Sequence, residues 1–328
     1  MSQPTDPSES FAARTALCEL MQEISSLPSA LACAEGAGAL LQLHRQDATP
    51  PLLTLCWQAG RMAWEAYPNH EPIATAWTHT LCLLTTAYGS HDLLQETFRC
   101  QEEREAVAAR FPHSEGVQYW NAQSNFEMVT VLAQRGYPKS IPIYLDNLRT
   151  LSRTWRDRAP FSALYAMALA NAAAAYAQLQ EVPAAHEQLD DLRALARQNS
   201  DSAEVLQAYA RGLQQVAWYC GELVTPLVLH GLALELAELL TARSIRRECG
   251  PRAVAELGVY AAYFAHRGEL AYAADALREA CRWLEAVALD PEQIPMVVET
   301  FRSAAGRLRL SEPELAALAE ARTERLMV

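Results

Sequence analysis

Short turn segments recur along this chain at nearly regular intervals, and this recurrence constrains the fold more than any other feature. The segments are TAYGSHDLL at Gly89, AQRGYPKSI at Gly136, AQLQEVPAA at Gln180, WYCGELVTP at Gly221 and AHRGELAYA at Gly268. Successive turns therefore lie 47, 44, 41 and 47 residues apart. Because each turn separates two segments of helical character, the chain is predicted to fold as a series of helix–turn–helix units.

The segments between the turns carry the period of an amphipathic helix. PAAHEQLDDLRALARQ and AYAADALREACRWLEAVAL place Ala and Leu at i, i+3, i+4 and i+7, with charge on the other face. Residues that favour helices dominate, whereas β-branched and aromatic runs are scarce. Glycine permits the positive φ that a short connection needs, and Pro138 and Pro183 suit a first helical turn. An all-α fold is therefore predicted.

Two segments resemble the tetratricopeptide repeat (TPR) superfamily. In LGVYAAYFAHRGELAYAADALREA, a helix of Ala and aromatic residues precedes a Gly turn, with small residues at Ala273 and Ala280. LANAAAAYAQLQEVPAAHEQL matches through Ala173, Tyr176 and Ala185. The resemblance implies a right-handed α-α superhelix, a TPR-like solenoid of antiparallel helix pairs. Since a standard TPR has about 34 residues, the longer interval is more similar to TPR-like parts of bacterial regulators.

The expected organisation is one TPR-like domain over residues 1–328. Residues 1–66 are helical but lack a clear turn, which is typical of a divergent first repeat or cap. The core repeats occupy residues 70–290, and residues 291–328 supply C-terminal capping helices. The last helix begins near Ser311 and Glu314, which have the spacing of a capping box.

The charge of the chain disfavours several classes of partner. A formal net charge of −12 repels phosphate backbones and anionic lipids, so no nucleic acid and no membrane is expected as a partner. A local exception is a group of arginines, which is either a phosphate or acidic-peptide site or a solvated helix end: Arg243, Arg246, Arg247 and Arg252. The uncharged stretch 161–180 has the length of a membrane span, but its Asn, Gln and alanine content predicts a packed interior helix.

Cysteine usage and the polar first residues predict a cytoplasmic protein. The eight cysteines are scattered without a C-x-x-C pair, so small apolar core residues are expected rather than a disulfide framework or zinc site. The segment MSQPTDPSES lacks the pattern of a signal peptide. One lysine, Lys139, against 26 arginines indicates a GC-rich bacterial genome.

Short motifs of catalytic or cofactor chemistry are incomplete. Gly36-Ala-Gly38 lacks the third glycine and the preceding strand of a dinucleotide fingerprint. Asp190 and Asp191 are helix neighbours that point in different directions, and H-E-x-x-H, G-x-S-x-G and P-loop patterns do not occur. We therefore expect no enzyme activity, no cofactor and no metal site.

Polar residues that interrupt the first helix of each pair are the candidate binding residues. In TPR-like solenoids this helix lines a concave groove, so the resemblance places there His79, Gln123, Glu127, Asn171, Gln178, Arg211, Gln215, Tyr219 and His266, with Thr80 beside the first of them. Asn and Gln can pair with an extended peptide backbone, and Arg can hold a carboxylate by two parallel bonds. The alternative is hydrogen bonding between repeats or solvation. Asn121 and Asn125 are further candidates that by position face the neighbouring hairpin.

Three functions remain open at this stage. The favoured one is a non-enzymatic scaffold or adaptor whose groove binds a peptide or helix of a partner protein. The second is a regulatory sensor that changes curvature on binding a small molecule or signalling peptide. The third is an all-helical enzyme whose site is assembled from scattered residues. The oligomeric state follows from none of these features.

Overall fold

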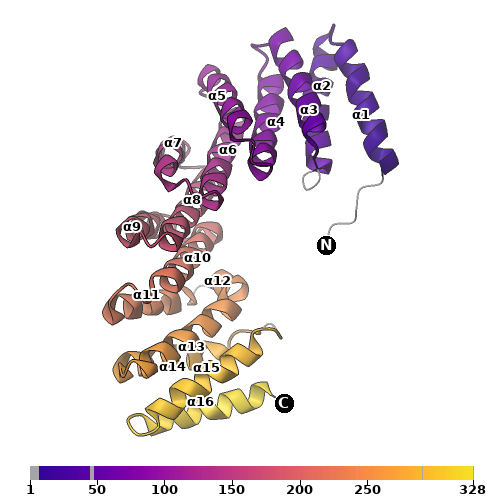
Figure 1. Cartoon of the computed structure of the whole chain (residues 1–328). Coiled ribbons are helices and arrows are strands. Elements are labelled where there is room, and N and C mark those ends of the chain that lie inside the picture. The colour runs from indigo at the N-terminus through magenta and orange to yellow at the C-terminus, as the bar shows by residue number, and fades with distance from the viewer. Residues whose placement is uncertain (1–6, 45–47, 242, 290, 328) are drawn as a thin grey trace. The chain divides into compact units, whose positions relative to one another are not determined.

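The all-helical fold is confirmed. The computed structural model describes residues 7–44, 48–241, 243–289 and 291–327, and these ranges contain sixteen α-helices, one 3-10 helix and no strand. In the order shown in Figure 1, the elements are α1 (Pro7–Gln22), α2 (Leu27–Leu43), α3 (Pro50–Ala66), α4 (Glu71–Ser90), α5 (Leu94–Arg110), α6 (Glu115–Gln134), η1 (Pro138–Ser140), α7 (Ile141–Thr154), α8 (Ala159–Gln178), α9 (Val182–Gln198), α10 (Ala203–Cys220), α11 (Pro226–Leu239), α12 (Arg243–Glu248), α13 (Gly250–His266), α14 (Leu270–Leu284), α15 (Ile294–Leu308) and α16 (Pro313–Leu326).

The starting residues of the helices recur at a constant interval. The first helices of successive pairs, α2, α4, α6, α8 and α10, begin at residues 27, 71, 115, 159 and 203. The second helices, with η1 as the first turn before α7, begin at residues 50, 94, 138, 182 and 226. Both series advance by 44 residues at every step. The interval therefore extends back to α2 and α3, where the sequence showed no clear turn.

A left-handed residue closes four of the connections from a first to a second helix. The residues with positive φ are Asp92 (63°), Gly136 (72°), Gln180 (62°) and Gly268 (80°). At each, the amide N–H bonds a carbonyl three residues earlier, and the next amide bonds a carbonyl five residues earlier, as Glu269 does with Phe264 at 2.9 Å. This is the Schellman arrangement, which satisfies the last carbonyls of a helix. The same backbone geometry thus recurs after 44, 44 and 88 residues.

Two of the glycines used as turn markers occupy a different position in the repeat. Gly89 is buried inside α4, where an added Cβ would lie 2.6 Å from Cγ2 of Val131. Gly221 follows α10 with a φ of −55°. Both stand at a small-residue position that Ala133, Ala177 and Ala265 fill in the other pairs. The other three markers, Gly136, Gln180 and Gly268, stand at the left-handed position three residues later. The five turn markers are therefore unequally spaced.

The connection from a second helix to the next first helix is also regular. The amides of His70, Ser114, Arg158 and Ser202 bond the carbonyls three residues earlier, which belong to Tyr67, Phe111, Trp155 and Asn199. The hydroxyls of Ser114 and Ser202 additionally accept the amides of Val117 and Val205. Such serine caps stabilise a helix start by about 1 kcal/mol.

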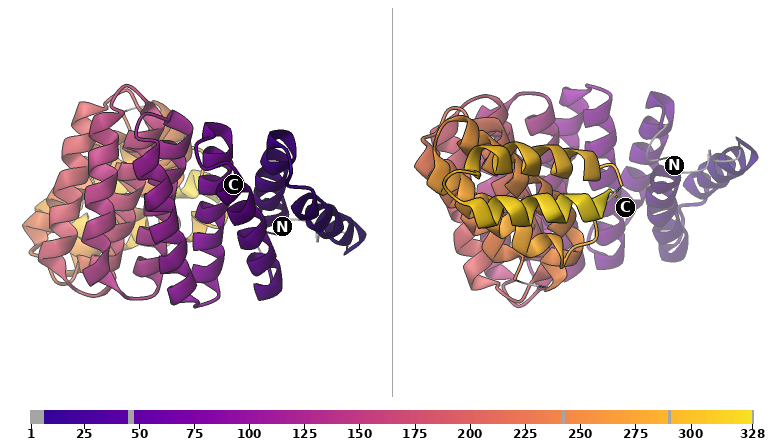
Figure 2. Two further views of the ribbon diagram at one scale, coloured as in Figure 1. Left: turned by 90° about the horizontal axis from the view of Figure 1, so that it is seen from above. Right: turned by 90° about the horizontal axis from the view of Figure 1, so that it is seen from below.

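The contacts of the chain divide into two compact units, residues 1–165 and 166–328. In the first unit, Trp77 of α4 is almost fully buried within a core to which α2, α3 and α5 contribute. In the second, α13 packs against α14 and α15, with Phe264 and Phe301 fully buried. Figure 2 shows α15 and α16 running side by side. One continuous solenoid domain stays a prediction.

Cysteine burial and helix hydropathy agree with two further expectations. Six cysteines are buried, at positions 33, 56, 82, 100, 220 and 281, whereas Cys249 is partly buried and Cys18 is exposed. Burial raises the pKa of the Cys33 thiol to about 11. Among the described residues, no helix is both long enough and apolar enough to cross a bilayer.

Replacing glycine by alanine should change the free energy of unfolding in opposite directions at two glycines of the second unit, because only one of them lies in a left-handed turn. Gly268→Ala should lower the free energy of unfolding by about 1–2 kcal/mol, because an L-residue pays about this much for positive φ. Gly306→Ala, inside α15 with no atom within 4 Å of the added methyl, should raise it by about 0.5–1 kcal/mol, because Gly is the poorer helix former. Urea denaturation followed by circular dichroism measures both changes. Two shifts of the same sign would contradict the assigned turn.

Candidate functional site

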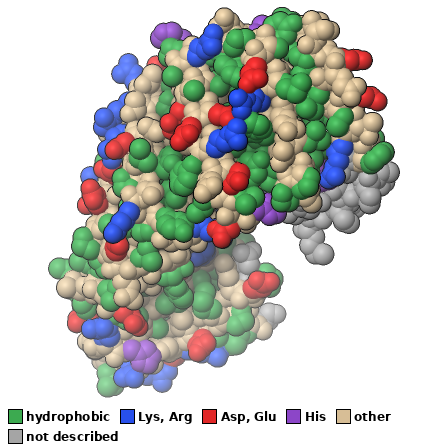
Figure 3. Space-filling model, turned by 45° about the horizontal axis from the view of Figure 1, so that its top comes forward, with side chains coloured by type: hydrophobic (Ala, Val, Ile, Leu, Met, Phe, Trp, Pro, Cys, Tyr) green, Lys and Arg blue, Asp and Glu red, His purple; other side chains and the backbone are tan. Residues whose placement is uncertain are grey.

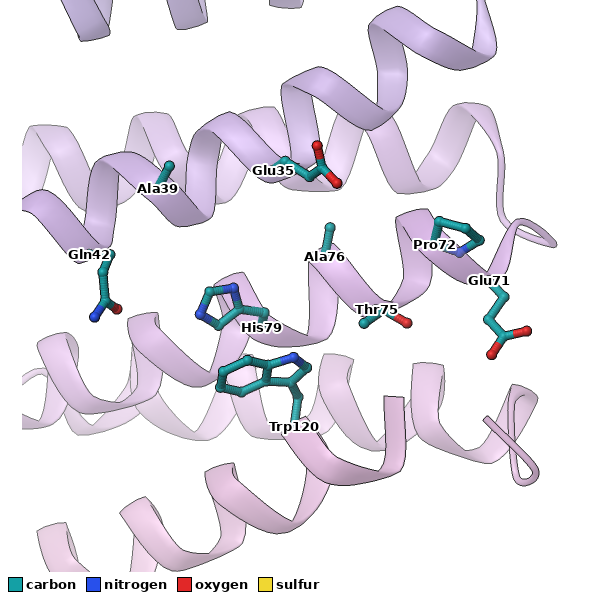
Figure 4. A pocket seen from close by; sticks show the side chains of 9 residues that line it. All are labelled: Glu35, Ala39, Gln42, Glu71, Pro72, Thr75, Ala76, His79 and Trp120. Atoms are coloured by element: carbon teal, nitrogen blue, oxygen red, sulfur yellow. The ribbon is translucent and has the colours of Figure 1, made fainter. Parts of the chain in front are cut away.

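A groove runs along the first unit between α2 and α4, and α6 contributes one residue to it. Its volume is about 590 Å³. The lining residues, drawn in Figure 4, are Glu35, Ala39, Gln42, Glu71, Pro72, Thr75, Ala76, His79 and Trp120. Ala39 and Ala76 supply small side chains in the middle of the groove, so a bound segment can approach both helices closely.

α2 approaches α4 closely beside the groove. A Cβ added to Gly38 would lie 3.3 Å from Nδ1 of His79 and 3.3 Å from Oγ1 of Thr80. The Thr80 hydroxyl is buried and donates to the carbonyl of Ala76 at 3.0 Å. The Gly36-Ala-Gly38 pattern therefore lies inside α2 and serves helix packing. Thr80 acts in the same contact and does not line the groove.

His79 and Trp120 form a stacked pair at the centre of the groove. Their ring centroids are 3.9 Å apart with an interplanar angle of 26°, and Tyr119 meets the indole edge-on at 5.1 Å. Burial lowers the pKa of His79 below its ordinary value of 6.5. The imidazole is therefore neutral at pH 7 and does not offset the carboxylates of the groove.

Two exposed carboxylates stand at one end of the groove. Glu35 of α2 and Glu71 of α4 lie on the same side of the His79–Trp120 stack, whereas Gln42 lies toward the other side (Figure 4). Neither carboxylate forms a hydrogen bond or ion pair within the part of the chain that the structure describes. This end of the groove can therefore accept hydrogen bonds from a positively charged group.

Of the candidate residues in the first unit, His79 alone lines this groove. Gln123 and Glu127 lie on α6, where the amide of Gln123 donates to the Glu127 carboxylate at 2.9 Å. Glu127 is buried and Gln123 is partly buried. These two side chains thus bond to one another along their own helix.

The candidates of the second unit fall into three places. Asn171 is partly buried in α8, and Gln178 is the exposed last residue of that helix. On α10, Arg211 and Tyr219 are exposed and Gln215 is partly buried. His266 ends α13 and is exposed; its Nε2 lies 3.2 Å from the hydroxyl of Ser303 and its Nδ1 lies 3.5 Å from Arg307. Asn171 and Gln178 lie seven residues apart on one face of α8, and the three α10 residues lie four apart on one face of that helix.

Four lining residues were not among the candidates expected from the sequence, namely Glu35, Gln42, Glu71 and Trp120, and the repeat interval contains the signal for two of them. Glu35 stands 44 residues before His79, which stands 44 before Gln123. Trp120 occupies the position at which the other first helices carry Ala76, Leu164 and Ala208. An aromatic side chain among smaller residues at one repeat position is a signal that the unequal spacing of the markers concealed.

Asn121 and Asn125 belong to a buried polar network between α5 and α6. The guanidinium of Arg104 is fully buried and donates to the carbonyl of Asn121 at 2.9 Å. The Asn125 side chain accepts from Gln101 at 3.4 Å and from Asn147 of α7 at 3.3 Å. Burial lowers the pKa of Arg104 to about 10, so it remains charged at pH 7. The two asparagines therefore face neighbouring helices, as their positions suggested.

Two members of the arginine group on α12 and α13 take part in local contacts. The side chain of Arg243 lies outside the described residues. Arg246 donates to the carbonyl of Leu240 at 3.0 Å and covers the ring of Trp283 at 5.1 Å, and Arg252 donates to Glu256 at 2.9 Å. On the face visible in Figure 3, basic and acidic side chains are interspersed. These contacts favour structural roles for Arg246 and Arg252 over a phosphate site.

No protein-family model matches the chain, and a search of curated proteins gave no match either. Within the described ranges, His, Cys, Asp and Glu side chains form no group of three or more that could hold a metal ion. The candidate site is a groove with a stacked His–Trp pair and two carboxylates that have no partner among the described residues.

The buried Glu256 should make the second unit less stable as the pH rises. Burial raises the pKa of this carboxyl from 4.5 to about 7, although the Arg252 hydrogen bond acts in the opposite direction. Between pH 4.5 and pH 7 the Glu256 carboxyl is ionised in the unfolded chain and protonated in the folded chain. The stability that this carboxyl contributes below pH 4.5 is therefore lost as the pH rises through 7. Glu256→Gln cannot ionise, and from pH 4.5 to pH 8 it should gain up to about 3 kcal/mol relative to the wild type, at about 1.4 kcal/mol per pKa unit.

Urea denaturation at several pH values measures this difference, with Glu187→Gln as the matched control. Glu187 is an exposed carboxyl on α9 of the same unit. The control should follow the wild-type pH dependence. The assignment is wrong if the Glu256→Gln and wild-type stabilities change in parallel across this pH range.

Proposed function

We propose that this chain is a non-enzymatic interaction module of TPR-like helix pairs whose α2–α4 groove binds a segment of a partner protein. The observation that carries the proposal is the groove itself, where two exposed carboxylates without described partners stand beside a stacked His79–Trp120 pair. The bound segment is an extended peptide or a helix that presents at least one Arg or Lys.

The chemistry of the groove supports a basic segment. Glu35 and Glu71 supply acceptors for charge-assisted hydrogen bonds, which are about twice as strong as neutral ones. The exposed part of the Trp120 ring offers an apolar surface that also attracts cations. Gln42 carries both a donor and acceptors, so it can pair with peptide backbone. The neutral His79 and the net charge of −12 leave the field of the groove negative at pH 7.

The regular helix pairs support the TPR-like solenoid as the framework of this module. Pairs that advance by 44 residues with the same left-handed turn are what a solenoid needs, because each pair then stacks on the next in the same way. The helices are longer than those of a standard repeat of about 34 residues. Bacterial regulators with TPR-like parts remain the class that the chain resembles.

A regulatory sensor is the second candidate, and the groove volume favours it. Pockets for small ligands have volumes of about 300–1,000 Å³, and the groove has about 590 Å³. Such a ligand would carry a positive charge for the same reason as the peptide. A cytoplasmic location is part of both proposals.

Selection from a displayed peptide library with the purified chain tests the first proposal. Enriched peptides should contain Arg or Lys, and Glu35→Gln/Glu71→Gln should weaken their binding at least about tenfold, since each lost charged contact contributes about 1.5–3 kcal/mol. Trp120→Leu should weaken binding as well. Fluorescence anisotropy of labelled peptides measures both effects, and circular dichroism verifies that the variants are folded.

The matched control for the double variant is Glu19→Gln/Glu102→Gln. These two exposed carboxyls lie on α1 and α5 of the same unit, outside the groove, so the net charge changes equally. The control should bind the peptides like the wild type. If both double variants bind equally well, the groove assignment fails.

Thermal shift against pools of cationic metabolites separates the sensor from the peptide module. A small ligand at 100 times its Kd should stabilise the chain by about 2.7 kcal/mol. This shift should disappear in Glu35→Gln/Glu71→Gln. Peptide binding without any metabolite shift favours the interaction module.

A further inference from the structure

A second unpartnered surface lies on the first helix of the last regular pair, in the second unit. Arg211, Gln215, Trp218 and Glu222 follow one another at i, i+4, i+7 and i+11, which places them along one face of α10 and its continuation. Gly221 keeps a right-handed helical conformation, so the face extends to Glu222. We call these four residues the α10 stripe.

The stripe exposes a large apolar side chain between two unpaired charges. Trp218 is 60% exposed, and Arg211 and Glu222 are also exposed. Within the residues that the structure describes, the guanidinium of Arg211 and the carboxylate of Glu222 form no hydrogen bond or ion pair. By contrast, Arg193 of the neighbouring α9 donates to Tyr209 at 2.9 Å and pairs with Glu235 at 2.6 Å.

Exposed apolar residues continue past the end of the stripe. Leu223 is 49% exposed, Leu227 is 64% exposed and Val228 is 39% exposed, all within ten residues of Trp218. They lie at the connection to α11, which packs against α10. This connection also lacks the left-handed residue that closes four other connections. The turn geometry therefore changes at the place where apolar surface is exposed, and such patches are typical of protein–protein interfaces.

The order of charges along the stripe makes it complementary to itself. Arg211 and Glu222 are equidistant from the midpoint between Val216 and Ala217, and so are Gln215 and Trp218. When two copies of α10 pack antiparallel about a two-fold axis through this midpoint, each Arg211 faces the Glu222 of the other copy, and each Gln215 faces a Trp218. The two Trp218 residues then stand three residues apart along the axis, about 4.5 Å, close enough for the indoles to meet.

We propose that the α10 stripe is an isologous interface through which two copies of this chain form a dimer. In an interface with two-fold symmetry, residue i contacts j and j contacts i, which is the relation that Arg211 and Glu222 have here. The two indoles form the central apolar contact. Leu223, Leu227 and Val228 extend the interface toward the roughly 800 Å² per partner of a stable complex. This proposal is independent of the groove between α2 and α4.

Sedimentation velocity and light scattering test the dimer, at about 0.15 M salt so that the net charge of −12 is screened beyond about 8 Å. From about 1 to about 100 µM protein, the range that covers the Kd of transient interfaces, the wild type should reach twice the chain mass of 36.3 kDa. Trp218→Ala should weaken association more than about thirtyfold, as is typical of a central interface residue. Its circular dichroism spectrum should be unchanged because the side chain is exposed.

A charge exchange tests the antiparallel arrangement. Arg211→Glu places like charges opposite one another and should weaken dimerisation at least about tenfold. Arg211→Glu/Glu222→Arg restores both pairs and should restore the dimer. Arg197→Glu is the matched control, since Arg197 is an exposed arginine on α9 of the same unit and its substitution changes the net charge equally. It should leave the dimer intact.

Three results would overturn the proposal. The first is a wild type that keeps the mass of one chain over the whole concentration range. The α10 stripe would then be a binding surface for a different protein. The second is a dimer that Arg211→Glu and Trp218→Ala leave intact. The third is a failure of Arg211→Glu/Glu222→Arg to restore association. Peptide binding in the α2–α4 groove should be unaffected by all of these variants, so this proposal and the proposed function can fail separately.

Discussion

The left-handed turn that closes four of the helix pairs is the constraint on which the rest of this structure depends. One residue with a φ between 62° and 80° lets two backbone hydrogen bonds end the first helix and start the second within a few residues. Because the turn is short, the two helices must run back along one another. Because equivalent helices begin 44 residues apart, the turn at Asp92 returns at Gly136 and again at Gln180. Each pair therefore presents equivalent positions on equivalent helix faces.

Equivalent positions allow different chemistry at one place in the repeat. Glu35, His79, Gln123 and Arg211 all occupy one position of a first helix, and Trp218 occupies the position of Gln42. In the first unit this position supplies a carboxylate and a stacked imidazole to the groove. In the second it supplies the unpaired guanidinium of the α10 stripe. The helical framework is repeated, whereas the recognition chemistry varies from pair to pair.

Some charged side chains are paired between neighbouring helices. Arg149 donates to Tyr165 at 2.8 Å, and 44 residues later Arg193 donates to Tyr209 at 2.9 Å. Such contacts hold a second helix against the first helix that follows it. Along the groove and the α10 stripe, Glu35, Glu71 and Arg211 are left without partners among the described residues. Exposed charges that no neighbour satisfies remain available to another molecule, and both proposals combine such charges with a tryptophan at the same place.

The sequence by itself determined the all-helical fold and the approximate interval of the helix pairs. It also identified His79 and the α10 residues as polar residues on first helices. These follow from local properties, namely helix propensity, amphipathic period and turn chemistry. Only the tertiary structure decided that Asp92 and Gln180 take the left-handed conformation alongside two glycines, because closing hydrogen bonds select the position rather than the residue type. It also decided that Trp120 stacks on His79, from a helix 41 residues further along the chain. Contacts between helices depend on how their faces pack, and no local pattern of residues specifies that packing.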